Sequence, residues 1–281
     1  MIAICPNPFR DAELKLTRQA VKLLNDAGFK TAVCPVFAGE NDRVILDNIE
    51  TERLGDIARD CSLIIIIGGD GTILAVSRQI KGLEVPLLGV NLGTKGFMAA
   101  LEPEDIGLIV KAARGEYKIS RRTMLDVSLI RDGKAVYTDY ALNDAVVHGY
   151  GDCVKISAWC DGERMTSFSG DGVIISTATG STGYSMSAGG PIVEPEADAM
   201  ILSPICAHTM SSRSFVLGPG RRISVKAEKL HGRKAYLSVD GNPVLDLSNG
   251  DMLLAERSEH CTLMVDMGRK SFYELAFEKL T

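Results

Sequence analysis

An aspartate between glycines is the most informative chemical feature of the sequence. The segment Gly68-Gly-Asp-Gly-Thr72 follows five consecutive apolar residues, 63–67, and such a run is typical of a strand buried on both faces of a parallel sheet. Thr72 is suited to cap a helix over 73–81, with Gly82 as its end signal. A strand, a glycine turn and a helix N-terminus together form a place where backbone N–H groups can face a phosphate.

Asp70 stands in the middle of this turn, which lacks the lysine of a Walker P-loop. A carboxylate beside bound phosphates repels them unless a metal ion intervenes or the carboxylate acts as a base. Phosphoryl transfer to an alcohol requires a group that accepts the hydroxyl proton. Asp70 is therefore a candidate catalytic base. The alternative is a tight turn in which Asp70 only caps the helix.

Two stretches in the second half carry polar groups suited to a nucleotide. Asn143-Asp144 combines an amide that donates with a carboxylate that accepts, as vicinal hydroxyls require, although the dipeptide is also common in turns. Residues 169–191 lead from a predicted strand at 173–176 into a loop of glycines and hydroxylated residues, with Tyr184 as its only aromatic residue. Such a loop lets a flat ligand approach the backbone. The alternatives are a Gly/Ser linker and, for Asp171, a hairpin turn.

The elements that must position these residues alternate between strand and helix in the first part of the chain. Strands are predicted at 2–5, 31–36, 63–67 and 85–90, and helices at 11–25, 52–59, 73–81 and 103–114. This alternation predicts an α/β domain with a parallel, doubly wound sheet. A glycine loop at 91–98 follows the last of these strands. We expect it on the same sheet edge as Asp70, because ligands in such sheets bind at the carboxyl ends of strands.

From about residue 118 the pattern changes to short alternating runs joined by Asp-Gly pairs at 132, 161 and 240. Asp-Gly between alternating segments is a strong hairpin signal, so we predict an antiparallel β-rich domain. A strand at 261–265 and a helix at 271–280 are expected to return to the first domain. The predicted division is 1–118 with 258–281 for the α/β domain, and 119–257 for the β-rich domain.

Composition narrows the class of protein. The 281 residues suit one large domain or two smaller ones, and the formal net charge of -5 argues against a nucleic-acid surface. The seven cysteines are scattered without a C-x-x-C pair, which favours buried free thiols over disulfides or a zinc site. No apolar run is long enough to span a bilayer. We expect a globular protein of a reducing compartment, the cytoplasm, with no membrane partner.

Taken together, the motifs resemble those of the NAD kinase family. Gly68-Gly-Asp-Gly-Thr72 matches its first motif, and Gly170-Asp-Gly with Thr179-Gly-Ser-Thr-Gly-Tyr-Ser and Ala188-Gly-Gly-Pro matches its longer second motif. Ser238-Val-Asp-Gly241 and the β-rich second half also fit, so the likeness covers nearly the whole chain. The resemblance implies transfer of the ATP γ-phosphoryl group to the adenosine ribose 2′-hydroxyl of NAD, giving NADP.

The resemblance also implies roles for individual residues, with Asp70 as the general base. NAD is expected to contact Asp70, Gly71, Asn143, Asp144, Asp171, Thr182, Gly183, Tyr184, Ser185, Met186, Ser187 and Asn242. The ATP phosphates are expected at Gly68, Gly69, Thr72, Gly96 and Phe97. Mg²⁺, or another divalent cation, is expected through the ATP phosphates rather than in a dedicated protein cage. The family also implies a homodimer or homotetramer.

The sequence departs from the family pattern at five positions. Asp144 replaces a glutamate, Ala178 a proline, Gly183 an alanine, Lys95 a leucine, and Ser169 a residue that is often basic. These departures bear on donor choice and on the preference between NAD and NADH. Two other readings remain at this point: a lipid kinase of the same superfamily, and a catalytically silent dinucleotide-binding sensor.

Overall fold

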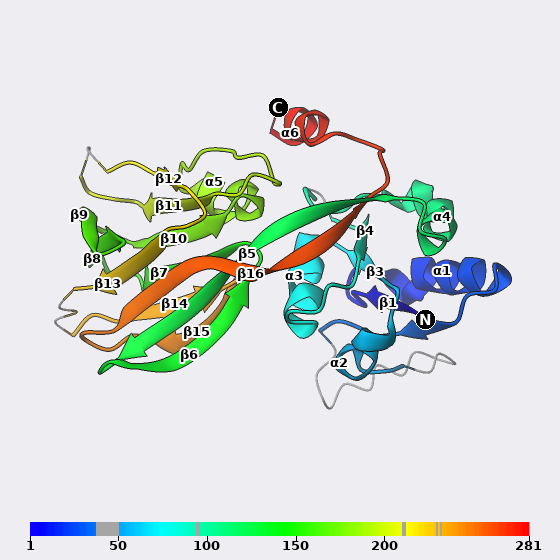
Figure 1. Ribbon diagram of the computed structural model, residues 1–281, viewed down its shortest axis with the longest axis horizontal. Coiled ribbons are helices and arrows are strands. Elements are labelled where there is room, and N and C mark those ends of the chain that lie inside the picture. The colour runs from blue at the N-terminus through cyan, green and yellow to red at the C-terminus, as the bar shows by residue number, and fades with distance from the viewer. Residues whose placement is uncertain (38–50, 94–95, 210–211, 229, 231, 281) are drawn as a thin grey trace. The chain divides into compact units, whose positions relative to one another are not determined.

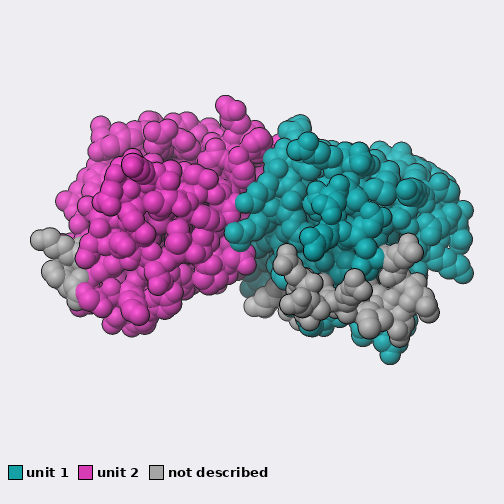
Figure 2. Space-filling model, turned by 90° about the horizontal axis from the view of Figure 1, so that it is seen from below, with its two compact units in different colours: residues 1–121, 262–281 teal, residues 122–261 magenta. Residues whose placement is uncertain are grey.

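The computed structural model describes residues 1–37, 51–93, 96–209, 212–228, 230 and 232–280. It divides into two compact units, which Figure 2 shows in different colours. The first unit comprises residues 1–121 and 262–281, and the second comprises residues 122–261. Lys95 lies outside the described residues. No helix in the described part of the chain is long and apolar enough to cross a membrane.

The sheet of the first unit is parallel, as the strand and helix alternation predicted (Figure 1). Its strands are β1 (Ile2–Pro6), β2 (Thr31–Val33), β3 (Leu63–Gly68) and β4 (Leu87–Asn91), in the order β2-β1-β3-β4. The end of β16 (Met252–Asp266) adds to β4 in parallel, with Met264 opposite Leu87. All six residues of β3 are buried, because the sheet is covered on both faces.

Helices cover the two faces of this sheet. One face packs against α1 (Lys15–Asp26), the 3-10 helix Pro103–Leu108 and α4 (Ile109–Ala113). The other face is covered by α3 (Asp70–Gln79), whose Ile73 lies so close to Gly89 that a Cβ there would be 2.9 Å from Ile73 Cδ1. Further short helices are Ala12–Leu14, α2 (Leu54–Ile57) and Ala58–Asp60. The doubly wound α/β arrangement is therefore confirmed.

The end of the chain differs from expectation in two respects. The predicted strand at 261–265 is the last part of β16, a continuous strand of 15 residues. The helix α6 (Phe272–Leu280) forms where a terminal helix was predicted, but none of its residues is buried. The strand β16 thus carries the return to the first unit's sheet, and α6 does not contribute to the core.

The second unit consists of two antiparallel sheets. One has the order β12-β11-β10-β7-β14-β15. Its strands are β7 (Asp144–Gly149), β10 (Gly172–Thr177), β11 (Met200–Ile205), β12 (Phe215–Leu217), β14 (Ala235–Val239) and β15 (Asn242–Asp246). The other contains β16, β5 (Lys118–Arg131), β6 (Lys134–Ala141), β8 (Val154–Cys160), β9 (Glu163–Gly170) and β13 (Arg222–Ala227). The predicted antiparallel β-rich architecture is confirmed, although β11 and β12 had no sequence prediction.

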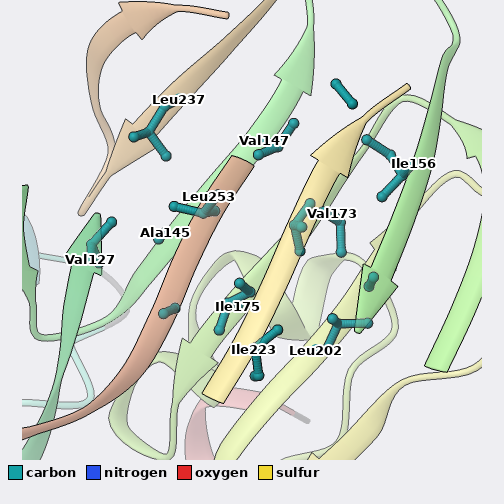
Figure 3. Packing of buried hydrophobic residues seen from close by; sticks show 14 of the residues in the cluster. Val127, Ala145, Val147, Ile156, Val173, Ile175, Leu202, Ile223, Leu237 and Leu253 are labelled. Carbon is teal, nitrogen blue, oxygen red and sulfur yellow. The ribbon is translucent and has the colours of Figure 1, made fainter. Parts of the chain in front are cut away.

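One hydrophobic core fills the space between these two sheets (Figure 3). Val147, Val173 and Leu237 point inward from one sheet, and Ile156 and Leu253 from the other. Because side chains alternate along a strand, Asp144, Val146 and His148 of β7 point to the opposite face. The core therefore fixes the strands that carry the polar residues, while those residues remain on the outer face.

The three Asp-Gly pairs form the predicted hairpin turns. Asp132, Asp161 and Asp240 have φ of 49°, 51° and 47°, and each following glycine also has a positive φ. Positive φ at both central residues is the geometry of the two-residue hairpin turn that matches strand twist, which Asp or Asn followed by Gly adopts at low cost. The pairs join β5 to β6, β8 to β9 and β14 to β15.

Cysteine burial differs from expectation. All seven thiols are free, but only Cys5, Cys34 and Cys61 are buried, and Cys206 is exposed.

Candidate active site

The predicted site residues fall into two groups, one within each unit. The first lies at the carboxyl ends of β1 and β3. The chain passes from β1 to β2 on one side and then crosses to β3 on the other side of β1. The direction of the strand order therefore changes between β1 and β3, and these two strands flank the topological switch point of the sheet. Crevices at such switch points are where open α/β sheets bind ligands. Asn7 follows β1 and Asp70 follows β3, which brings both residues to this crevice.

Asp70 is the first residue of α3 and its carboxylate is held by the second glycine loop. The backbone N–H of Phe97 donates to Oδ2 (2.9 Å), and that of Met98 donates to Oδ1 (3.3 Å). These two bonds fix the orientation of the Asp70 carboxylate. The predicted proximity of the two glycine loops is observed.

The start of α3 differs from the prediction. Gly69 is the N-cap residue, with extended backbone, and the helix begins at Asp70 rather than Ile73. Thr72 therefore does not cap the helix. Its side chain is buried, and its hydroxyl accepts a hydrogen bond from Asn7 Nδ2 (3.2 Å). A Cβ at Gly68 would clash with the Thr72 side chain, so this turn requires a glycine for close packing.

The second loop is shaped by Asn91, which the sequence reasoning did not single out. Its Oδ1 accepts from the Gly93 N–H (2.9 Å), and its Nδ2 donates to the Glu102 carboxylate. A Cβ at Gly96 would lie 2.8 Å from Asn91 Oδ1. Gly96 is consequently buried against Asn91, and the N–H of Phe97 is already bonded to Asp70. Gly96 and Phe97 thus shape this loop, and their contact with the ATP phosphates stays a prediction.

A cavity of about 380 Å³ opens beside Asp70. Asn7, Arg10 and Phe37 line it together with the two glycine turns. The guanidinium of Arg10 donates to the carbonyl of Leu92 (3.2 Å) and is exposed. Sequence reasoning missed Asn7, Arg10 and Phe37. Their signal is position: Asn7 and Arg10 directly follow the first strand, whose carboxyl end lies at the switch point.

The residues present fit a divalent cation held mainly by phosphates. No group of three or more His, Cys, Asp or Glu side chains that could hold a metal ion occurs in the described part of the chain. Mg²⁺ commonly binds one or two protein carboxylates together with substrate phosphates. The Asp70 carboxylate in this cavity is chemically suited to that mode.

The second group lies on the outer face of the six-stranded sheet, where β7 begins. Asn143 precedes the strand, and Asp144 faces Ser176 of β10 across the sheet. The carbonyl of Asn143 is so close to Gly180 that a Cβ there would clash with it. Asn143 Oδ1, Ser176 Oγ and Thr179 Oγ1 are buried without a hydrogen-bond partner. Because buried polar atoms are nearly always bonded, these three atoms indicate a place prepared for a polar ligand.

Asp144 is only 6% exposed. Burial, followed by the negative charge of Asp240, raises its pKa to about 7. A carboxyl with this pKa is present in both forms near neutral pH, so it can either donate or accept a hydrogen bond. The replacement of the family's glutamate by aspartate thus leaves an ionisable group in a solvent-poor position.

Tyr184 and Asp171 lie further along the same face. Tyr184 is 40% exposed, and its ring stacks on His148 at 6.4 Å between centroids, with an interplanar angle of 22°. Asp171 precedes β10, five residues from Ser176, or about 17 Å along an extended strand. Asp171 and Asp144 are therefore at opposite ends of the strand pair. A hydrogen bond to Asp171 raises the pKa of the exposed Cys206 thiol.

The remaining predicted residues differ in exposure. The stretch after β10 is not an open loop but a 3-10 helix, Thr179–Thr182, and the helical turn α5 (Tyr184–Ser187). Ser187 and Asn242 are exposed, and Thr182, Gly183 and Met186 are partly buried. Ser185 is fully buried, and its hydroxyl bonds to that of Ser203 (3.0 Å). This bond gives Ser185 a packing role, and its contact with the dinucleotide stays a prediction.

Comparison with known families covers both parts of the chain. Residues 2–116 match the model of the ATP-NAD kinase N-terminal domain, and residues 143–267 match that of the ATP-NAD kinase C-terminal domain. The NAD kinase of Acetivibrio thermocellus is 35% identical over 99% of this chain and 96% of its own length. The NAD kinase of Natranaerobius thermophilus is 33% identical over 100% of this chain and 97% of its own.

The chain is also similar to solved structures of NAD and NADH kinases. A yeast NADH kinase complexed with NADH superposes with a TM-score of 0.87 and 26% identity, covering 99% of this chain and 86% of the other. An NAD kinase from Archaeoglobus fulgidus in complex with ATP has a TM-score of 0.76 and 25% identity, covering 100% of this chain and 98% of the other. The comparisons do not favour a lipid kinase or a silent sensor. The two matching family models and the full-length relatives show that this chain is a phosphotransferase that belongs to the NAD kinase family.

Proposed function

We propose that this chain transfers the γ-phosphoryl group of ATP to the adenosine ribose 2′-hydroxyl of NAD, with Asp70 as the general base. The observation that carries the proposal is the Asp70 carboxylate, oriented by two backbone amides in a cavity at the switch point of the sheet. The NAD kinases of Acetivibrio and Natranaerobius, together with the ATP complex from Archaeoglobus, support the choice of substrates.

In this mechanism Asp70 accepts the proton of the 2′-hydroxyl as the oxygen attacks the γ-phosphorus. A bond forms between that oxygen and phosphorus, the bond to the bridging oxygen of ADP breaks, and ADP leaves with the electron pair. Phosphoryl transfer depends mainly on alignment and on neutralising charge. A divalent cation supplies charge neutralisation at the phosphates when bound. The fixed Asp70 carboxylate supplies the alignment of the acceptor.

We further propose that the ATP phosphates occupy the cavity beside Asp70. Gly69, Gly71 and the N-terminus of α3 provide backbone N–H groups and a partial positive charge. Arg10 also lines this cavity, and its positive charge offsets the repulsion between the Asp70 carboxylate and bound phosphates. Thr72 also lines this cavity, and the phosphate contacts of Gly68, Thr72, Gly96 and Phe97 stay predictions.

The dinucleotide is proposed to lie on the outer face of the six-stranded sheet. Asn143 and Asp144 offer an amide and a carboxyl to the ribose or adenine, close to the unpartnered hydroxyls of Ser176 and Thr179. Tyr184 offers an exposed aromatic face. The other contacts stay predictions at Asp171, Thr182, Gly183, Met186, Ser187 and Asn242. A homo-oligomeric state and a cytoplasmic location also stay predictions.

The decisive experiment measures NADP formation by the purified protein given NAD, ATP and Mg²⁺. Loss of a positioned base typically costs about a hundred- to ten-thousandfold in rate, so Asp70→Asn should lose that much kcat while still binding NAD. Asp56→Asn is a matched control, because Asp56 is also in the first turn of a helix but is exposed and outside the cavity. Unchanged turnover in Asp70→Asn would remove Asp70 from this role.

A wild-type protein that gives no product with NAD should next be supplied with NADH and with polyphosphate, because the departures at Asp144 and Gly183 bear on substrate choice. Absence of product with every pair of substrates would refute the proposed reaction.

A further inference from the structure

Asp240 occupies a hairpin turn, but its side chain is directed away from the turn. The residue is only 8% exposed, and its carboxylate reaches the segment that precedes β7. Oδ1 accepts the backbone N–H of Asn143 (2.8 Å) and of Asp144 (3.1 Å), while Oδ2 accepts that of Leu142 (2.9 Å). The backbone N–H of Asp240 in turn donates to the carbonyl of Asp144 (2.9 Å). One carboxylate thus holds three consecutive amides.

The other two Asp-Gly turns show that hairpin formation does not require this arrangement. Asp132 has nearly the same backbone φ, but it is exposed. Asp161 has the same backbone form as well, and its carboxylate accepts from Arg221 (2.9 Å) and from the backbone of Arg222 (2.9 Å). The turn geometry is therefore common to all three aspartates, while the contact with residues 142–144 belongs to Asp240.

The segment that Asp240 binds, residues 142–144, carries Asn143 and Asp144 of the candidate dinucleotide site. On its carbonyl side, the Thr177 hydroxyl donates to Leu142 O (2.6 Å), and the Thr177 N–H donates to Asn143 O (2.9 Å). The N–H side is held by Asp240. Backbone groups on both sides of Asn143 are held, so the backbone from which the Asn143 and Asp144 side chains project is fixed before a ligand arrives. Fixed geometry of this kind reduces the entropic cost of binding.

We propose that Asp240 is a positioning residue for the dinucleotide, which acts by fixing the backbone of residues 142–144 and thereby the side chains of Asn143 and Asp144. This inference rests on the proposed function, because those two side chains are the ones assigned to NAD. Asp240 itself contacts the protein and not the substrate. Its removal should therefore weaken dinucleotide binding more than ATP binding, since ATP is assigned to the cavity beside Asp70.

The charge of Asp240 provides a second, independent consequence. Asp240 faces Asp144 from the turn between β14 and β15. Tyr184 faces Asp144 from α5, and its phenol is neutral near pH 7. Within the described residues, Asp240 is the charged group that raises the pKa of Asp144, after burial itself. Removing this charge should lower the pKa of Asp144. The pH at which NAD affinity changes should then move to a lower value.

The test compares Asp240→Asn, Asp240→Gly and Asp132→Asn, with KM for NAD and KM for ATP measured separately between pH 5.5 and pH 8.5. Asparagine and glycine both tolerate the positive φ of residue 240. The asparagine variant keeps the size but places an NH₂ group against one backbone N–H. The glycine variant removes the carboxylate without that clash, so it tests the idea if the asparagine variant does not fold.

We expect KM for NAD to rise about tenfold or more in both Asp240 variants, as for loss of a charged acceptor to buried donors. KM for ATP should stay within about twofold, and Asp132→Asn should match wild type. In addition, the pH dependence of KM for NAD should shift to lower pH. An unchanged KM for NAD in both variants, an equal rise in both KM values, or an unshifted pH profile would overturn the proposal.

Binding of NAD measured by calorimetry separates this inference from the proposed reaction. A protein that makes no NADP refutes the proposed function, whereas weakened NAD binding in the two Asp240 variants still supports the positioning role. Equal NAD affinity in wild type and both variants overturns that role, whatever the turnover.

Discussion

Replacing Asp144 with asparagine should stabilise the protein above neutral pH. The Asp144 carboxyl has a pKa of about 7 in the folded chain, compared with about 4 for an aspartate exposed to water. Between these two values the folded state binds a proton that the unfolded state has released. Stability therefore falls as pH rises through this window. The destabilisation is absent below about pH 4, grows to about pH 7 and is constant above it.

The size of the effect follows from the pKa difference. About three units at 1.36 kcal/mol each give an upper limit of about 4 kcal/mol above pH 7. Between pH 5 and pH 8 ionisation of Asp144 should lower the free energy of unfolding by about 3 kcal/mol, because about two pH units of the pKa difference lie in that interval. Asparagine has nearly the same volume and does not ionise, so Asp144→Asn lacks this loss.

The assay is calorimetric unfolding of wild type, Asp144→Asn and Asp132→Asn at pH 5 and at pH 8. The comparison of variant with wild type at each pH cancels groups common to both proteins. We expect the Tm advantage of Asp144→Asn to grow by about 5–10 °C between the two pH values, and the exposed Asp132 control to show no such change. A Tm difference that is independent of pH would refute the reasoning, because it would mean that burial does not raise the pKa of this carboxyl.

Two further predictions concern the cavity beside Asp70. Gly68→Ala should lower the free energy of unfolding by about 1–3 kcal/mol, because the added Cβ clashes with Thr72. Gly71→Ala is the control, because its Cβ meets open space. Equal Tm values for the two variants in thermal unfolding would contradict this prediction. Arg10→Ala should raise KM for ATP about tenfold by removing a cation from bound phosphate, with partial recovery in Arg10→Lys and little change in KM for NAD. Steady-state kinetics with an unchanged KM for ATP would exclude this role.

Features that depend on neighbouring residues were predictable from the sequence. The apolar run 63–67 forms β3, because five large aliphatic side chains require burial on both faces of a sheet. The Asp-Gly pairs form hairpin turns, because aspartate and glycine tolerate positive φ. Both signals lie within a few residues of the element they specify. The fold class followed from them without knowledge of any distant contact.

The start of α3 could not be predicted in the same way. Thr72 is a good N-cap residue by type, but its hydroxyl is drawn to Asn7, 65 residues earlier in the chain. Gly69 then takes the N-cap position, which places Asp70 in the first turn and within reach of the Phe97 amide. A tertiary contact thus outweighed the local preference for the N-cap position. The position of Arg10 beside the cavity could not be predicted for a similar reason, since its hydrogen-bond partner, Leu92, is 82 residues away.

The role of Asp240 shows most clearly where local information ends. Its dipeptide is identical to those at 132 and 161, and all three turns have the same backbone form. The difference arises because β14 pairs with β7, which places the turn after β14 beside the residues that lead into β7. The three amides that Asp240 binds are 96 to 98 residues away in the sequence. A residue chosen locally for its turn thus gains a function from sheet topology, and a variant that preserves the turn but removes the carboxylate separates the two contributions.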